Sequence, residues 1–284
     1  MRSQNPITAP LIGDYMEEKR TPSQETVDEL VAPSDLSTDL LPHPARALTE
    51  VEIRQIISAY GQAARRVKAA GFDGVQIHGA HGYLVNQFLS PLTNHRSDRW
   101  GGSPQKRMQF LWDVASAVRT QVGPDYPVLI KLGLMDGKEG GLTLEESLLV
   151  IQSLEEMGID GVEISGGIGG DKVTNIVPGI KAGKNEAYFL PWAQRARPLT
   201  RLPILLVGGF RTRATMQQTL DSGAADFISL CRPLISETDL PERMRLGLQD
   251  RSICISGNLC WAKEPGQGIA CKCKVDRSIR EKAI

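Results

Sequence analysis

Two histidines and a tyrosine stand close together in the stretch GVQIHGAHGYL, residues 74–84. His78, His81 and Tyr83 can all donate hydrogen bonds or exchange protons. The alternating apolar residues before them predict a short buried strand, which breaks into glycines where these polar side chains begin. A hydrophobic core seldom gathers such groups at a strand end, so the pattern indicates an active site that carries out proton transfer.

Two later strands end in residues that suit a phosphate. The expected strands LPILLVGG (202–209) and ADFISLCRP (225–233) close on Gly208, Gly209, Cys231 and Arg232. Glycine lets the backbone approach an anion closely, and an arginine can pair with two phosphate oxygens at once. A glycine turn beside an exposed arginine is the purely structural alternative. Because both features end consecutive strands, the sequence favours a phosphate site.

Four cysteines near the end of the chain are candidate metal ligands. They are Cys254, Cys260, Cys271 and Cys273. Four thiolates are enough for a zinc ion or an iron–sulfur cluster, but the spacing C-x₅-C-x₁₀-C-x-C matches neither kind of site well. We therefore expect no metal and keep these residues as weak candidates.

The elements that must position these residues alternate along the chain. Thr49 and Glu52 have capping-box spacing and predict a helix that Gly71 ends. The expected strands are 73–78, 127–133, 159–167, 202–209 and 225–233, and the further helices are 107–122, 143–158, 212–222 and 240–248. Short apolar strands with helices between them predict a parallel sheet that is covered on both faces.

Every one of the five strands ends in glycine or polar residues. Functional residues at the carboxyl ends of successive strands are typical of a (β/α)₈ TIM barrel. A doubly wound sheet would instead carry a GxGxxG turn after its first strand, and the sequence has none. The fold class is therefore α/β of the TIM-barrel type. With about five βα units, the barrel is expected to be incomplete.

Composition excludes several classes of partner. Lysine plus arginine and aspartate plus glutamate number 33 each, so no basic field favours nucleic acid or an anionic membrane surface. No apolar run is long enough for a membrane span, and the first residues lack an apolar leader. The five cysteines, four of them late in the chain, do not form a disulfide framework. We expect a cytoplasmic protein that binds neither nucleic acid nor membrane.

The stretch HGAHGYLVNQFLSPLTNHRSDRWGGSPQKR (78–107) resembles the signature of the old yellow enzyme family of FMN-dependent ene-reductases. The similarity continues through the four later strands. It implies a (β/α)₈ barrel that holds FMN non-covalently and takes reducing equivalents from NADH or NADPH. It also implies a small-molecule substrate, an activated alkene with a carbonyl or nitro group. The phosphate site inferred above agrees with this resemblance.

The resemblance also accounts for the number of strands. The strand at 73–78 is similar to the family's fourth strand, so the five units correspond to strands 4–8. An open edge beside 73–78 should then be covered by residues 1–47 or recruit another chain, for example as a homo-oligomer. We expect a loop or capping segment at 1–47, a partial FMN-binding barrel at 48–250 and a cysteine-containing tail at 251–284.

The family's residue roles carry over to matching positions. The resemblance implies that His78 and His81 donate hydrogen bonds to the substrate oxygen and that Tyr83 delivers the proton. It places Lys131 against the flavin ring edge as a fixed cation. The other residues expected at the cofactor are Gly166, Gly167, Gly208, Gly209, Cys231 and Arg232. Three further residues of the motif are expected to brace its loop, namely Arg96, Asp98 and Arg107.

Two alternatives remain open at this point. One is a non-catalytic or partner-dependent remnant whose incomplete barrel does not hold FMN. The other is a relative of the iron–sulfur dienoyl-CoA reductase group, whose cysteine-rich tail the segment from Cys254 to Cys273 partly resembles. Flavin absorbance of the purified protein separates the first alternative from an FMN enzyme.

Overall fold

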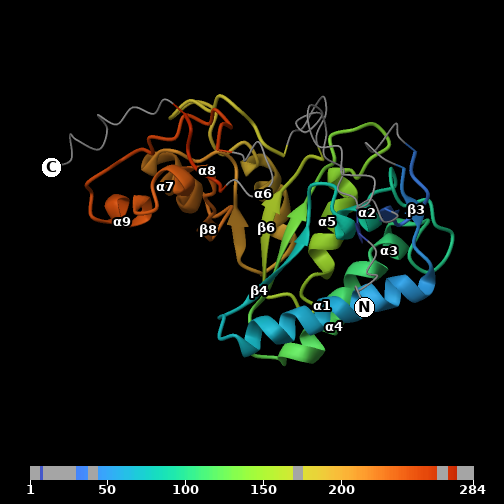
Figure 1. Cartoon of the computed structure of the whole chain (residues 1–284). Coiled ribbons are helices and arrows are strands. Elements are labelled where there is room, and N and C mark those ends of the chain that lie inside the picture. The colour runs from blue at the N-terminus through green and yellow to red at the C-terminus, as the bar shows by residue number, and fades with distance from the viewer. Residues whose placement is uncertain (1–6, 9–29, 38–43, 169–174, 261–267, 274–284) are drawn as a thin grey trace. The chain divides into compact units, whose positions relative to one another are not determined.

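The computed structural model describes residues 7–8, 30–37, 44–168, 175–260 and 268–273. The chain forms two compact units, drawn in Figure 1. The first unit consists of residues 1–175 and 198–202, and the second of residues 176–197 and 203–284. Within the described part of the chain, no helix is both long and apolar enough to cross a membrane.

The first unit contains both sheet and helix. Its strands are β1 (Ile7–Thr8), β2 (Leu30–Ala32), β3 (Arg46–Ala47), β4 (Val75–Gly79), β5 (Val128–Gly133) and β6 (Gly161–Ser165). Its helices are α1 (Glu50–Ala69), α2 (Leu84–Leu89), α3 (Pro104–Arg107), α4 (Gln109–Val122) and α5 (Leu144–Ser153).

The central sheet of the first unit is parallel and buried. β4 pairs with β5, and β5 pairs with β6, in a register that aligns His78 with Lys131 and Lys131 with Glu163. Apolar side chains such as Ile130 and Ile164 are fully buried between the layers. The register therefore puts one row of polar side chains across three strands near their carboxyl ends.

Helix α1 begins as its sequence predicts. The Thr49 backbone N–H donates to a Glu52 carboxylate oxygen at 2.8 Å, and the Thr49 hydroxyl accepts from the Glu52 backbone N–H. The helix packs closely along α4, as Figure 1 shows. A Cβ atom at Gly61 would lie only 2.8 Å from the carbonyl oxygen of Ala117, so glycine is needed for this close packing. The two helices therefore form one closely packed helical layer of the first unit.

Part of the segment expected to be a loop forms a second, small sheet. β1 pairs with β2 and β2 pairs with β3, all in parallel. The apolar side chains of Ala32, Leu36 and Ala45 form a buried cluster with Ile168, which follows β6. Residues 1–6, 9–29 and 38–43 of the predicted capping segment lie outside the described residues, so its role at the barrel edge stays a prediction.

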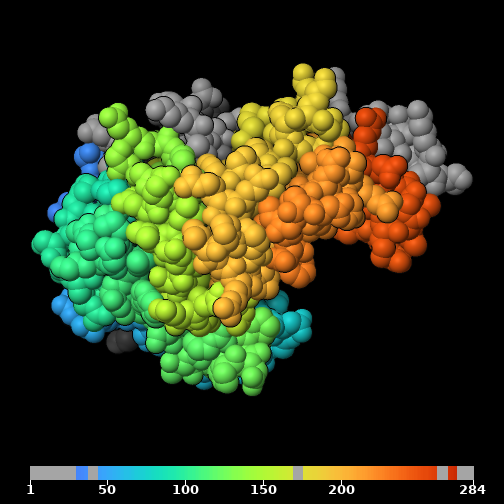
Figure 2. Space-filling model, turned by 180° about the vertical axis from the view of Figure 1, so that it is seen from behind, coloured from blue at the N-terminus to red at the C-terminus, as the bar shows by residue number. Residues whose placement is uncertain are grey.

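The second unit carries the last two strands. Its elements are α6 (Leu190–Ala196), β7 (Ile204–Leu206), α7 (Arg213–Asp221), β8 (Phe227–Ile228), α8 (Arg232–Ser236) and α9 (Leu240–Arg245). A short 3₁₀ helix at Arg197–Leu199 runs across the boundary between the units. β7 and β8 are parallel, with Leu206 opposite Ile228. Figure 2 shows the orange residues around α7 exposed at the surface, and Thr219 is the one buried residue of this helix.

All five predicted strands are present, but several predicted boundaries were wrong. The last strand ends at Ile228, and Arg232 begins helix α8 instead of ending the strand. Pro233 accounts for this, because proline favours the first turn of a helix and interrupts a strand. The expected helix at 107–122 is divided at Met108 into α3 and α4, and α5 ends at Ser153, before Gly158.

Helices α2 and α6 were not predicted from the sequence. They have 6 and 7 residues, respectively, which is too few for helical periodicity to stand out. Strand β4 lies at one edge of the sheet and has β5 as its one strand partner among the described residues. Its second edge is the open edge that the sequence predicts, and what covers it stays a prediction.

Candidate active site

The structure brings the three residues of the opening stretch together at the end of β4. The His78 ring centroid lies 5.7 Å from that of His81 and 4.8 Å from that of Tyr83. Both histidines are half-buried, whereas 38 % of Tyr83 is exposed. Tyr83 is therefore open to solvent, while the two histidine rings beside it are more deeply placed.

The turn that carries His81 has an unusual backbone. His81 has φ of 62° and Gly82 has φ of 76°, so two successive residues are left-handed. Left-handed backbone is uncommon for residues other than glycine and often accompanies functional sites. Two buried side chains of α2 hold the turn: Asn86 Oδ1 accepts from the Gly82 N–H at 2.7 Å, and Gln87 Nε2 donates to the Gly82 carbonyl at 2.8 Å.

The His81 ring is held on both sides by residues that follow and end β6. Its Nδ1 lies 3.0 Å from the Gly167 carbonyl oxygen, and its Nε2 lies 3.1 Å from Ser165 Oγ. A carbonyl oxygen only accepts, so Nδ1 carries the proton and Nε2 accepts from the Ser165 hydroxyl. Burial lowers the pKa of His81 to about 4, despite the opposing Gly167 hydrogen bond, so the ring is neutral at pH 7. In this arrangement His81 has no free N–H.

His78 differs from His81 in this respect. Its ring has no hydrogen-bond partner among the residues that the structure describes. Burial and then the positive charge of Lys131 lower the pKa of His78, while Glu163 opposes the shift. A neutral imidazole keeps one ring N–H, which His78 can offer to a bound oxygen. Of the two predicted donors, His78 is the one that needs no rearrangement, and the donor role of His81 stays a prediction.

The lowered pKa of His81 predicts how stability depends on pH. Below pH 6.5 the unfolded chain takes up a proton at His81, while the folded chain resists protonation down to about pH 4. Stability therefore falls as the pH falls through this window, by up to about 1.4 kcal/mol per pH unit from this residue. His81→Asn is the reference variant, because asparagine tolerates left-handed backbone and does not titrate here.

Urea unfolding of the wild type and of His81→Asn at several pH values checks this prediction. The difference cancels the contribution of other titrating groups, including Asp136, whose pKa burial raises. We expect the wild type to lose stability relative to the variant on acidification. A difference that stays constant between pH 6.5 and 4 would mean that His81 titrates normally in the folded protein.

Lys131 lies beside this cluster and is paired with a carboxylate that the sequence analysis missed. Its Nζ is 2.6 Å from Glu163 Oε1, and Gln76 Nε2 donates to the other carboxylate oxygen at 3.1 Å. Glu163 is 8 % exposed. The sequence did carry a signal for this pair, namely a glutamate inside the otherwise apolar strand GVEIS. A buried charge needs a partner, so this residue could have been expected to form an ion pair. Lys131, the cation expected at the flavin, is therefore present, and Glu163 partly neutralises its charge.

The loop-bracing role expected of three motif residues is confirmed. The Arg96 guanidinium pairs with Asp98 at 2.6 Å, and its Nη1 donates to the carbonyls of Pro33 and Leu48. Arg107 is buried and donates through Nε to the Leu89 carbonyl and through Nη1 to that of Gly102. These bonds tie the stretch after α2 to the segments on either side of it.

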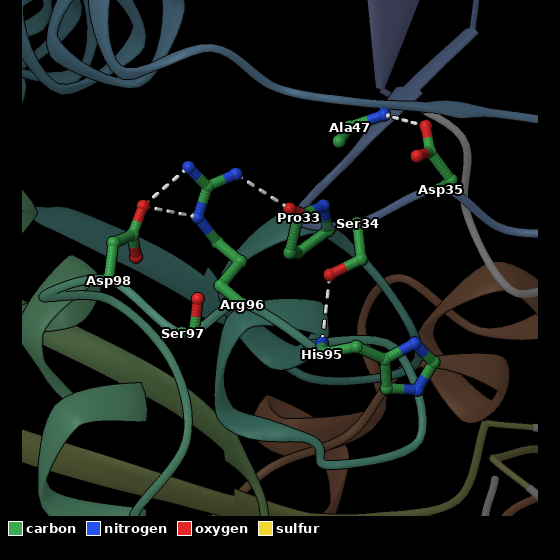
Figure 3. A pocket seen from close by; sticks show the side chains of 8 residues that line it. All are labelled: Pro33, Ser34, Asp35, Ala47, His95, Arg96, Ser97 and Asp98. Carbon is green, nitrogen blue, oxygen red and sulfur yellow. Dashed lines mark hydrogen bonds and ion pairs between the residues drawn. The ribbon is translucent and has the colours of Figure 1, made fainter.

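The braced loop also borders a pocket of about 460 Å³, seen from close by in Figure 3. Its lining comes from three stretches of the chain: Pro33, Ser34 and Asp35, then Ala47, then His95, Arg96, Ser97 and Asp98. Ser34 Oγ accepts from the His95 backbone N–H, and Asp35 accepts from the Ala47 N–H, as Figure 3 shows. None of the catalytic or cofactor residues predicted from the sequence lines this pocket.

In the second unit, the predicted phosphate turn packs against the protein's own chain. A Cβ atom at Gly208 would lie 3.1 Å from the Tyr188 nitrogen, and one at Gly209 would lie 2.8 Å from Tyr188 Cε1. The Glu186 carboxylate accepts from the backbone N–H groups of Arg211 and Thr212, at 2.6 and 2.9 Å. These two N–H groups are therefore satisfied internally, and a phosphate would rely on the glycine turn and on Arg232.

The remaining predicted residues lie near these two groups or in the tail. Gly166 and Gly167 are buried directly after β6, and Gly167 has φ of 82°. Cys231 is exposed at the start of α8. The four tail cysteines carry free thiols, with Cys254 and Cys260 buried. No three histidine, cysteine or acidic residues of the described chain are placed to hold a metal ion, and the metal question stays open.

Comparison with known proteins shows the family to which this chain is similar. The model of the NADH:flavin oxidoreductase / NADH oxidase family matches residues 8–251. The NADH oxidase of Thermoanaerobacter brockii is 34% identical over 248 residues, which are 87% of this chain and 38% of that protein. The NADPH dehydrogenase of Geobacillus thermodenitrificans is 34% identical over 74% of this chain and 59% of its own length. The old yellow enzyme homologue of Zymomonas mobilis superposes with a TM-score of 0.63 at 29% identity, covering 80% of this chain and 64% of that one.

The fold is of the TIM-barrel class, with five βα units among the residues that the structure describes. The chain belongs to the NADH:flavin oxidoreductase / NADH oxidase family. It spans 38% and 59% of the length of the two curated relatives given above. The family's cofactor is FMN and its reductant NADH or NADPH, which confirms the cofactors expected from the sequence.

The residues present fit FMN chemically. Lys131 supplies a cation within the buried sheet of the first unit, where an electron-rich ring edge would be stabilised. In the second unit, Arg232 supplies a guanidinium whose Nε and Nη2 have no partner among the described residues. A cation for a ring edge and a guanidinium for a phosphate are the donor types that the cofactor requires.

Proposed function

We propose that this chain carries the catalytic residues of an FMN-dependent reductase of activated alkenes, compounds whose double bond is conjugated to a carbonyl or nitro group. NADH or NADPH is the source of hydride. The observation that carries the proposal is the contact of a neutral, unpaired His78 ring with the ring of a solvent-accessible Tyr83. A hydrogen-bond donor beside a proton donor suits addition of hydrogen across a polarised double bond.

Bound FMN would supply the hydride chemistry, which no side chain of this protein can perform. His78 would donate its ring N–H to the carbonyl or nitro oxygen of the substrate, where negative charge builds up as hydride arrives at the far carbon. Tyr83 would then give its hydroxyl proton to the carbon next to the carbonyl. Because Tyr83 is 38 % exposed, solvent can return that proton afterwards.

The other residues of the site would hold these two in place. Ser165 and Gly167 fix the His81 ring, and the neutral ring forms the wall beside His78. Lys131 would stabilise negative charge on the cofactor ring, and Glu163 would limit the strength of that effect. For His81 to donate through Nε2 as well, its proton would have to leave Nδ1, and the hydrogen bond to the Gly167 carbonyl would be lost.

An anaerobic assay with FMN tests this function. NADPH oxidation is followed at fixed protein concentration with 2-cyclohexenone, and with the saturated ketone cyclohexanone as the matched control. We expect oxidation of NADPH with the enone only, together with formation of cyclohexanone in equal amount. Oxidation that occurs only when oxygen is admitted would contradict the proposal and would favour electron transfer to oxygen.

A further inference from the structure

The guanidinium of Arg232 is anchored at one of its nitrogens, and its opposite edge has no partner in the part of the chain that the structure describes. Nη1 donates to the Val177 carbonyl at 2.8 Å and to Asn258 Oδ1 at 2.6 Å. Both acceptors are neutral, and no carboxylate of the described chain pairs with this arginine. Nε and Nη2 have no partner there and are not sealed from solvent. An uncompensated positive charge with two open donors is suited to an anion.

Asn258 makes its hydrogen bond to Arg232 from a strained and buried position. The residue is 8 % exposed and has φ of 57°. Because arginine only donates, the amide oxygen must face Nη1, and this fixes the orientation of the amide group. The amide nitrogen is then left buried without a partner among the described residues. Buried donors are nearly always paired. The residue that holds Arg232 is therefore an exception, because its buried amide N–H groups have no partner among the described residues.

Tyr188 connects this arginine to the glycine turn of the predicted phosphate site. Its ring edge packs on Gly209, where a Cβ atom would come within 2.8 Å. Burial raises the pKa of the Tyr188 hydroxyl, and the nearby charge of Arg232 opposes that shift. The glycine turn therefore packs on Tyr188, and the charge of Arg232 is close enough to act on the same side chain.

We infer that Asn258 is a positioning residue for an anion site in the second unit. With the Val177 carbonyl, it fixes Nη1 of Arg232 so that the Nε–Nη2 edge can pair with two oxygens of a phosphate monoester. Under the function proposed above, on which this inference rests, that monoester is the phosphate of FMN. The segment after Asp250 thus contributes to cofactor binding through its asparagine, and its cysteines are not required for this.

Affinities for FMN and for riboflavin, which lacks the phosphate, test the inference. They are measured by quenching of flavin fluorescence on the full chain. Asn258→Gly removes the amide and accepts the left-handed backbone without strain. We expect it to weaken FMN binding roughly tenfold or more, as for a lost contact to a charged group, and to leave riboflavin binding unchanged. Equal weakening of both flavins would overturn the inference, because a merely structural residue would act on both.

Two further variants sharpen the result. Asn258→Asp keeps the shape and the acceptor oxygen but adds a negative charge beside Arg232, so FMN should weaken while riboflavin does not. Asn185→Ala removes an amide that accepts from the Lys181 N–H in the same unit and does not contact Arg232, so the affinity ratio should stay at the wild-type value. A normal ratio in Asn258→Asp would contradict the electrostatic part of the inference.

Failure of the proposed function can be told apart from failure of this inference. A wild-type chain that binds neither flavin contradicts the proposed function. The same variants are then compared by the rise in melting temperature that inorganic phosphate gives. A rise in the wild type that is lost in Asn258→Gly and kept in Asn185→Ala supports the anion site, and an equal rise in all three rejects it.

Discussion

Replacing Tyr83 with phenylalanine is expected to slow enone reduction by about 10²–10⁴-fold, the usual contribution of a positioned acid. The substitution removes one hydroxyl and keeps the ring that packs 4.8 Å from the His78 ring centroid. Reduction of the bound flavin by NADPH does not use this proton, so its rate should stay near that of the wild type. Stopped-flow flavin absorbance measures both half-reactions separately.

Tyr60→Phe serves as the control for loss of a phenol. Tyr60 lies in α1, outside the cluster, and should give wild-type rates in both half-reactions. In Tyr83→Phe, re-oxidation of the flavin by a nitroalkene should be slowed less than re-oxidation by an enone. The nitronate that hydride transfer produces is stable enough to be protonated later by solvent. If Tyr83→Phe slows flavin reduction and leaves enone reduction intact, Tyr83 is not the proton donor.

Replacing His78 with alanine is expected to lower the rate of enone reduction by about 10²-fold or more, as for loss of a donor at a developing oxyanion. The bound flavin should be retained, because His78 is assigned to the substrate oxygen. The double variant His78→Ala, His81→Ala should also lose affinity for phenolic ligands, which present an oxygen to the same donors. Ligand titration of the flavin absorbance measures that affinity.

The structure indicates which of these two histidines should contribute more to the rate. The His78 ring has no hydrogen-bond partner among the described residues, whereas both His81 nitrogens are occupied by Gly167 and Ser165. His78→Ala alone should therefore account for most of the loss. His95→Ala is the control, since that histidine lines the pocket of Figure 3 and not the catalytic cluster. Unchanged enone reduction in the double variant would remove both histidines from the mechanism.

The sequence predicted the strands and the grouping of His78, His81 and Tyr83 well because both depend on local pattern. Apolar runs such as VLIKLG and GVEIS are buried wherever a parallel sheet forms, and β5 and β6 lie where those runs stand. The spacing of His78, His81 and Tyr83 across one turn is enough to bring their rings together. The capping boxes at Thr49 and Thr143 are equally local and are both formed.

Three features of the site could not be predicted from the sequence, because they depend on contacts between residues that are far apart in the chain. The tautomer of His81 is set by Ser165 and Gly167, more than eighty positions away. The pairing of Lys131 with Glu163 follows from the strand register, which no local pattern specifies. The free edge of Arg232 depends on Asn258 in the tail, where only the cysteines stood out in the sequence.

The central claim, that this chain uses flavin to carry hydride from NAD(P)H to an alkene, is tested most directly by one anaerobic spectral cycle. The protein is loaded with FMN, excess flavin is removed, and absorbance near the flavin maximum is recorded. We predict that one equivalent of NADH or NADPH bleaches the bound flavin and that one equivalent of 2-cyclohexenone restores the colour. Flavin that is not retained, or that is bleached but not restored by the enone, would contradict the account.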